Sequence, residues 1–130
     1  MTLIYLANVR IPTEKAHGLQ IMKMCEAFNK LKIGDKKIEV ELVIARRRNQ
    51  QFKNIDPFDL YKTSERFPIK KLWLLDLVDF ERLFFGSSSF IQNTSFALSS
   101  FFYFLFKKAD IIYSRDVFSL FLLSFFKKNL

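Results

Sequence analysis

The chain has 130 residues, of which 50% are hydrophobic and 17% aromatic, and an excess of Lys and Arg over Asp and Glu gives it a net charge of +8. This composition is too apolar for a disordered chain, and the length suits one domain rather than two. The basic balance makes anionic groups such as phosphates, lipid headgroups or nucleic acid the partners to consider.

Residue counts exclude several common nucleotide and metal sites. The three glycines, Gly18, Gly34 and Gly86, are too far apart for a G-x-G-x-x-G or Walker A motif. One cysteine, Cys25, and one histidine, His17, are too few for a disulfide or for a zinc site of ordinary ligand count. We therefore expect no NAD, ATP or metal cofactor, and a reducing compartment.

No segment has the features of a secretory signal or of a membrane-spanning helix. The apolar start, residues 1–7, has no basic region before it and is followed at once by Asn8 and Arg10. The longest apolar runs, 101–106 and 117–126, are shorter than the roughly 20 residues that cross a bilayer. We expect a cytoplasmic protein.

The first part of the chain predicts a strand, a helix and a second strand. Residues 3–7 form a short run that is mostly apolar on both faces, as in a central parallel strand. A helix is predicted from 18 to about 32, with Glu26 and Lys30 paired on the side that faces water. Its apolar face is formed by Ile21, Met24, Cys25 and Phe28. Residues 38–44 then alternate with the two-residue period of a strand.

The second part continues the alternation of helices and strands. Asp56 and Pro57 are the cap and first residue of a short helix that ends at Tyr61. The remaining predicted elements are a strand at 69–75, helices at 76–85 and 89–108, a strand at 110–113 and a helix at 117–128 that Asp116 caps.

Strands that alternate with helices predict a doubly wound α/β domain with a parallel sheet and right-handed crossovers. We expect the first strand to be central, between the second and the fourth. Ligands of such sheets bind at the carboxyl ends of the strands. That rule brings three segments to one edge of the sheet: 8–18, 45–48 and 114–116.

Two segments resemble a known family. Residues 3–28, LIYLANVRIPTEKAHGLQIMKMCEAF, are similar to the opening strand, loop and helix of the N-terminal domain of family 4 glycosyltransferases. Residues 110–116, DIIYSRD, resemble a later strand and turn of the same domain. The resemblance extends over essentially the whole chain. At 32–37 the chain departs from the short Gly-His turn of these proteins, which predicts a surface insertion.

The resemblance implies a Rossmann-like domain and the N-terminal half of a GT-B glycosyltransferase. Such enzymes move a sugar from a nucleotide diphosphate sugar to an acceptor without an obligatory metal, and they hold the donor mainly through a C-terminal domain. We therefore expect residues 1–130 to be an incomplete, acceptor-side domain that is inactive alone. The expected acceptor is a glycan or a lipid-linked molecule, as in the biosynthesis of cell-surface polysaccharides.

The candidate residues for binding the donor phosphate or the acceptor are Arg10, Lys15, His17, Gly18, Arg115 and Asp116. Gly18 would let backbone N–H groups approach a phosphate, or it serves chain geometry alone. The cations and His17 offer charge-assisted hydrogen bonds, and Asp116 is a helix cap that could also orient Arg115 or a sugar hydroxyl. No carboxylate partner marks His17 as a general base, so the catalytic residue stays unassigned.

Two other patterns keep alternatives open. Arg46–Arg48 is a basic run suited to nucleic acid, but no aromatic residues alternate with it, so a solvated loop is favoured. Residues 96–106, followed by Lys107 and Lys108, form either a core helix, which is favoured, or a peripheral contact with the inner face of a membrane. The alternative to a transferase half is a basic, non-catalytic module that binds anionic lipid or nucleic acid. A third reading is a fragment that does not fold stably alone.

Overall fold

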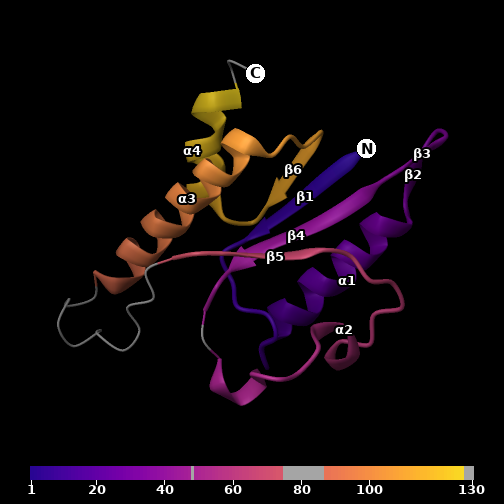
Figure 1. The fold of residues 1–130 in the computed structure, drawn as a ribbon, viewed down its shortest axis with the longest axis horizontal. Helices are drawn as coiled ribbons and strands as arrows, with labels where there is room; N and C mark the ends of the chain where they lie inside the picture. Colours follow the sequence, from indigo (N-terminus) through magenta and orange to yellow (C-terminus); the bar gives the residue numbers. More distant parts are fainter. Residues whose placement is uncertain (48, 75–86, 128–130) are drawn as a thin grey trace.

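The computed structural model describes residues 1–47, 49–74 and 87–127 (Figure 1). Its main feature is a four-stranded parallel sheet in the order β5-β4-β1-β6. The four strands are β1 (Thr2–Ala7), β4 (Glu39–Ala45), β5 (Ile69–Leu72) and β6 (Ile111–Ser114). The predicted position of the first strand, between the second and the fourth of the predicted strands, is confirmed.

Helices cover both faces of this sheet, so the architecture is α/β and compatible with a Rossmann-like fold. The helices α1 (Ala16–Lys30) and α2 (Pro57–Leu60) lie on one face, and α3 (Ser88–Phe106) and α4 (Val117–Lys127) lie on the other (Figure 1). A short 3-10 helix, η1 (Gln50–Phe52), follows β4.

The apolar run of β1 is explained by burial on both sides. Leu3 and Tyr5 pack in the core on the α1 side, whereas Ile4 and Leu6 pack with Phe96 of α3 on the other. Side chains of this size contribute about 1.5–3 kcal/mol each when fully buried. The continuous hydrophobic pattern of residues 3–7 therefore reports a strand enclosed by two helical layers.

Residues 32–37 form an exposed antiparallel hairpin of β2 (Lys32–Ile33) and β3 (Lys36–Lys37) at the surface. Gly34 has a φ of +60° in the turn between them, a conformation that glycine adopts without steric cost. The hairpin extends away from the sheet near the end of α1 (Figure 1). The hairpin therefore adds an exposed turn between α1 and β4, and the alternation of helices and sheet strands continues on either side of it.

The boundaries of the predicted elements shift by a few residues. The first helix begins at Ala16 and ends at Lys30, and the third predicted strand ends at Leu72. The helix predicted at 76–85 lies outside the described residues, as do residue 75, the last of the predicted strand at 69–75, and residue 128, the last of the predicted helix at 117–128. In the described part of the chain, no helix has the length and hydropathy needed to cross a membrane.

One prediction about the first helix is wrong. The ion pair of Glu26 with Lys30 is present at 3.0 Å, but the Glu26 side chain is only 8% exposed rather than facing water. The segment after α2 covers it, and the Ser64 N–H donates to the Glu26 carboxylate at 2.8 Å. Lys23 contacts the same carboxylate at 3.1 Å. Helical periodicity could not reveal this contact, because the covering segment lies 38 residues away.

Candidate functional site

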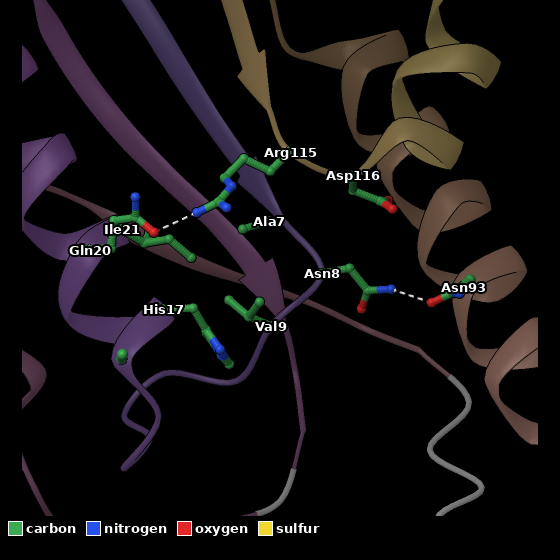
Figure 2. Close-up of a pocket in the computed structure, with 10 residues that line it drawn as sticks. Ala7, Asn8, Val9, His17, Gln20, Ile21, Asn93, Arg115 and Asp116 are labelled. Atoms are coloured by element: carbon green, nitrogen blue, oxygen red, sulfur yellow. Dashed lines mark hydrogen bonds between the residues drawn. The ribbon is translucent and has the colours of Figure 1, made fainter.

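A pocket of about 520 Å³ lies at the carboxyl ends of β1 and β6 (Figure 2). The chain leaves β1 for α1 on one face of the sheet and leaves β6 for α4 on the other. The two connections diverge there, which is the topological switch point where α/β sheets bind ligands. The lining residues come from three elements, β1, α1 and α3, and from the segments that follow β1 and β6: Ala7, Asn8, Val9, Ala16, His17, Gln20, Ile21, Asn93, Arg115 and Asp116.

Arg115 connects the β6 side of the pocket with α1. It directly follows β6, and its guanidinium Nη1 donates a hydrogen bond of 2.6 Å to the side-chain oxygen of Gln20 on α1 (Figure 2). A guanidinium carries five N–H donors. This single bond therefore orients Arg115 over the pocket and leaves the group able to bind an anionic oxygen as well.

Asn8, the first residue after β1, is held from two sides. Its side-chain nitrogen donates to the Asn93 side-chain oxygen of α3 at 2.8 Å (Figure 2). Its side-chain oxygen accepts from the Arg47 guanidinium at 2.9 Å. Since a guanidinium can only donate, the Arg47 contact fixes which end of the Asn8 amide is the oxygen. Asn8 thus presents a fixed amide at the pocket.

The same contact corrects the prediction for the basic run after β4. Arg46 is exposed, but Arg47 is partly buried and binds Asn8 at the edge of the pocket, while Arg48 lies outside the described residues. The interpretation of 46–48 as a solvated loop is therefore wrong for Arg47. The cause is parallel pairing: β4 and β1 end side by side, so residues that follow them meet.

His17, in the first turn of α1, lines the pocket and is partly buried. Burial lowers the pKa of its imidazole below the usual 6.5, and the positive charges of Lys15 and Arg115 lower it further. The imidazole is therefore neutral at pH 7, with one nitrogen that donates and one that accepts. An anion bound beside it would favour the protonated form and raise this pKa.

Asp116 lines the pocket and caps α4, as the sequence predicts. Its carboxylate accepts a hydrogen bond of 3.2 Å from the Ser119 N–H and another from the Ser119 hydroxyl. Its own N–H donates to the Ser114 hydroxyl at 2.9 Å. The side chain that orients Arg115 is Gln20, not Asp116. The carboxylate of Asp116 instead accepts hydrogen bonds from the first turn of α4 and caps that helix.

Gly18 lies behind the pocket lining and is explained by close packing. A Cβ atom at this position would lie 2.5 Å from the Tyr61 hydroxyl oxygen and 2.6 Å from the Thr13 methyl carbon. The Gly18 N–H donates to the Lys15 carbonyl at 3.0 Å. The absence of a side chain therefore permits contact between α1, the preceding loop and Tyr61, with no ligand needed to account for it.

The structure brings together His17, Arg115 and Asp116, but not the other candidates. Arg10 lies 3.5 Å from Glu14 in an exposed ion pair, and Lys15 is exposed just before α1. Neither lines the pocket. Both lower the pKa of His17 through their charge, so their influence on the pocket is electrostatic.

The sequence-based search missed the amide side chains of the pocket. Asn8 could have been found, because it directly follows a predicted central strand. Asn93 belongs to a polar group, 92–95, near the start of the Phe-rich helix, and that interruption was the available signal. Gln20 lies on the side of α1 that lines the pocket. The helical periodicity of α1 does not show that this side meets the residues that follow β6.

The described residues offer no cluster for a metal. No group of three or more His, Cys, Asp or Glu side chains is gathered in the parts of the chain that the structure describes. Cys25 is buried in the core on the α1 side, and burial raises the pKa of its thiol to about 12. It therefore behaves as a small apolar side chain rather than as a nucleophile.

Comparisons with protein-family models, with curated proteins and with solved structures found no match to this chain. What the protein does must therefore follow from the fold, the pocket and the resemblance carried by residues 3–28 and 110–116.

Proposed function

We propose that this chain is the acceptor-side, N-terminal half of a GT-B glycosyltransferase, and that the pocket between β1 and β6 binds part of the sugar acceptor or of the donor diphosphate. The observation that carries the proposal is the set of side chains at the switch point. His17 of α1 and Arg115, which follows β6, line the same pocket, and the Asn8 amide lines it beside Asn93 (Figure 2).

These groups suit a ligand that combines an anion with hydroxyl groups. The guanidinium of Arg115 and the imidazole of His17 match phosphate oxygens. The amides of Asn8 and Asn93 can donate to and accept from sugar hydroxyls. Lys15 and Arg10 add positive potential around His17 without lining the pocket.

In this proposal, the pocket of this chain binds part of the acceptor or of the donor diphosphate, and a second domain binds most of the donor. The pocket lining holds one cation, Arg115, and three amide side chains, and its carboxylate, Asp116, caps α4 instead of pairing with His17, so we assign the pocket binding rather than a general base. In the GT-B arrangement that residues 3–28 resemble, a second domain holds most of the donor. The protein is then expected to transfer sugar only when a donor-binding domain completes it.

The test measures nucleotide release from UDP-glucose and GDP-mannose by this chain joined to a GT-B donor domain, natural or rebuilt. Arg115→Ala and His17→Ala should each lower turnover by about tenfold or more, the loss expected for a charge-assisted hydrogen bond. Arg66→Ala is the matched control, because Arg66 is 66% exposed and pairs with Asp56 beside α2. Its turnover should be unchanged.

Two results would contradict the proposal. If the completed protein releases no nucleotide from any nucleotide sugar tried, the chain is not half of a transferase. If turnover is present but equal in the parent, Arg115→Ala and His17→Ala, the pocket is not the binding site. Residues 1–130 without a partner domain should show no turnover at all.

A further inference from the structure

The three amide side chains that line the pocket each accept a hydrogen bond through their oxygen. The Asn8 oxygen accepts from the Arg47 guanidinium at 2.9 Å, and the Asn93 oxygen accepts from the Asn8 nitrogen at 2.8 Å. On the α1 side, the Gln20 oxygen accepts from the Arg115 guanidinium at 2.6 Å. All three amides are thus engaged with the protein through the oxygen.

The two arginines determine this orientation. A guanidinium donates hydrogen bonds and accepts none, so the atoms that Arg47 and Arg115 contact must be amide oxygens. With its oxygen toward Arg47, Asn8 presents its nitrogen to Asn93, which must accept with its own oxygen (Figure 2). Arg47 does not line the pocket. It nevertheless sets the direction of a chain of two amides that does.

The hydrogen-bonding groups left for a ligand are mainly donors. An amide nitrogen carries two N–H groups, and a guanidinium carries five. Asn8 and Arg115 each use one of these donors in the bonds just described. The nitrogens of Asn93 and Gln20 donate no hydrogen bond to the residues that the structure describes. Four side chains of the lining therefore have N–H groups to spare.

Acceptors are fewer. Asp116 is the carboxylate of the lining, and its Oδ2 accepts from both the N–H and the hydroxyl of Ser119 at the start of α4. The neutral imidazole of His17 offers one accepting nitrogen. Each amide oxygen already accepts one hydrogen bond, which leaves it one lone pair at most. Donors therefore outnumber the acceptors that a ligand could use.

A pocket of this kind suits a ligand whose oxygens only accept hydrogen bonds. The ionised oxygens of a phosphodiester, a diphosphate or a sulfate carry no proton, and their charge makes each hydrogen bond about twice as strong as a neutral one. A sugar hydroxyl has a proton that needs an acceptor of its own, and a buried O–H without one loses its hydration with no return. The balance of donors and acceptors thus favours an oxyanion over a sugar ring.

We infer that Arg47 is a positioning residue that makes the pocket selective for oxyanions without a proton. By holding the Asn8 oxygen, it leaves N–H groups of Asn8 and Asn93 to the ligand. The loop that carries Arg47 is also held in place, because the Asn49 side chain donates to the Pro12 carbonyl oxygen at 3.2 Å. That the oxyanion is a phosphoryl group of a substrate rests on the proposed function, whereas the selectivity does not.

The experiment compares sulfate with hydrogen phosphate at about pH 8, where both are mainly dianions. Hydrogen phosphate keeps one O–H that needs an acceptor, and sulfate has none. Each anion is titrated into the full chain, and the shift of the His17 imidazole resonances gives its dissociation constant. We expect sulfate to bind about threefold or more tightly than hydrogen phosphate, the effect of one O–H without a good acceptor.

Arg47→Met removes the guanidinium and keeps a long side chain. The Asn8 amide can then turn over and offer its oxygen to the phosphate O–H. Loss of the Arg47 charge weakens both dianions alike, so the ratio of their dissociation constants isolates the effect of amide orientation. This ratio should fall to about one.

Two matched variants control for charge and for packing. Arg46→Met makes the same charge change at the neighbouring residue, which is exposed, and its ratio should equal that of the parent. Arg47→Lys keeps a cation that can only donate, so most of the preference for sulfate should return. Circular dichroism of each variant checks that the fold is kept, and the ratio measured for the parent depends on no variant.

Equal ratios in the parent and Arg47→Met would overturn the inference. Tighter binding of hydrogen phosphate than of sulfate by the parent would do so as well, because an acceptor such as Asp116 would then take up the O–H. The inference is also wrong if neither anion shifts the His17 resonances. No nucleotide sugar enters these titrations, so a preference for sulfate in a protein that transfers no sugar would leave the inference standing while the proposed function fails.

Discussion

The Tyr61 hydroxyl accepts a hydrogen bond from the Thr13 N–H and donates one to the Thr13 carbonyl oxygen, each at 2.7 Å. Thr13 is 2% exposed and belongs to the loop that leads from β1 past the pocket into α1. A residue at the end of α2 thus satisfies both backbone groups of a buried loop position. It also occupies the space beside Gly18.

Tyr61→Phe should destabilise the protein by about 1–3 kcal/mol, because it leaves a buried N–H and C=O without their shared partner. Chemical unfolding followed by circular dichroism measures this loss. Tyr113→Phe is the control, since it removes the same hydroxyl from a side chain that is 36% exposed, and its effect should stay within about 0.5 kcal/mol. Similar losses in the two variants would mean that the contacts with Thr13 add nothing.

Gly18→Ala should lower the free energy of unfolding by up to about 2 kcal/mol. Alanine gains about 1 kcal/mol in helix propensity over glycine, but its Cβ would lie 2.5 Å from the Tyr61 oxygen, and overpacking of this kind costs roughly 1–3 kcal/mol. The melting temperature should therefore fall, while His17→Ala, one residue earlier, leaves it nearly unchanged. A rise in the melting temperature of Gly18→Ala would show that the neighbours give way and that packing does not require glycine.

The fold was predictable because its signals are local. The two-sided apolar run of 3–7 and the alternation in 38–44 both report burial that each strand experiences along its own length. The central place of the first strand followed from its two-sided apolar run and from the alternation of strands and helices, which need no contact information. The contacts that could not be predicted join residues far apart in the sequence. Ser64 donates a hydrogen bond to Glu26, and the Tyr61 hydroxyl bonds both backbone groups of Thr13. No local sequence pattern relates these partners.

The pocket was only half predictable for the same reason. The carboxyl-end rule placed His17 and Arg115 on one edge, and they do line one pocket. Charge alone also selected Arg10 and Lys15, because sequence cannot separate a cation that lines a pocket from one that is close to it. Asn8 has no charge to draw attention, although hydrogen bonds with Asn93 and Arg47 hold its side chain at the pocket from both ends.

Glu26 should make stability depend on acid pH. Hydrogen bonds from Ser64 hold the pKa of this carboxyl well below its ordinary 4.5, and Lys30 and Lys23 lower it further. In the unfolded chain the carboxyl takes up its proton first as the pH falls, so its contribution is complete above about pH 4.5 and declines below it.

Glu26→Gln tests this, since it removes the charge at nearly constant volume. The variant should be less stable than the parent at neutral pH, and the difference should shrink as the pH is lowered below 4.5. Glu39→Gln, at an exposed position of β4, is the control and should parallel the parent. A difference between parent and Glu26→Gln that is constant with pH would assign the effect to packing instead of charge.

His17 provides a direct measure of the pocket, because it is the single histidine of the chain and its imidazole resonances are unambiguous. Its pKa should lie below 6.5 in the free protein, mainly through burial. The sign for stability follows: as the pH falls, the unfolded chain binds the proton first, so this group lowers stability progressively below about pH 6.5. Arg115→Ala should raise the pKa, since one of the nearby positive charges is then gone.

Sulfate extends the titration to ligand binding, since it keeps its charge throughout this range. If Arg115 and His17 hold one anion between them, sulfate should raise the pKa of His17 in the parent and do so much less in Arg115→Ala, which has lost a donor. Arg66→Ala, whose ion pairs with Asp56 and Asp59 lie beside α2, should respond like the parent. An equal response in the parent and Arg115→Ala would mean that the anion interacts with His17 alone, so the two residues would not form a common anion site.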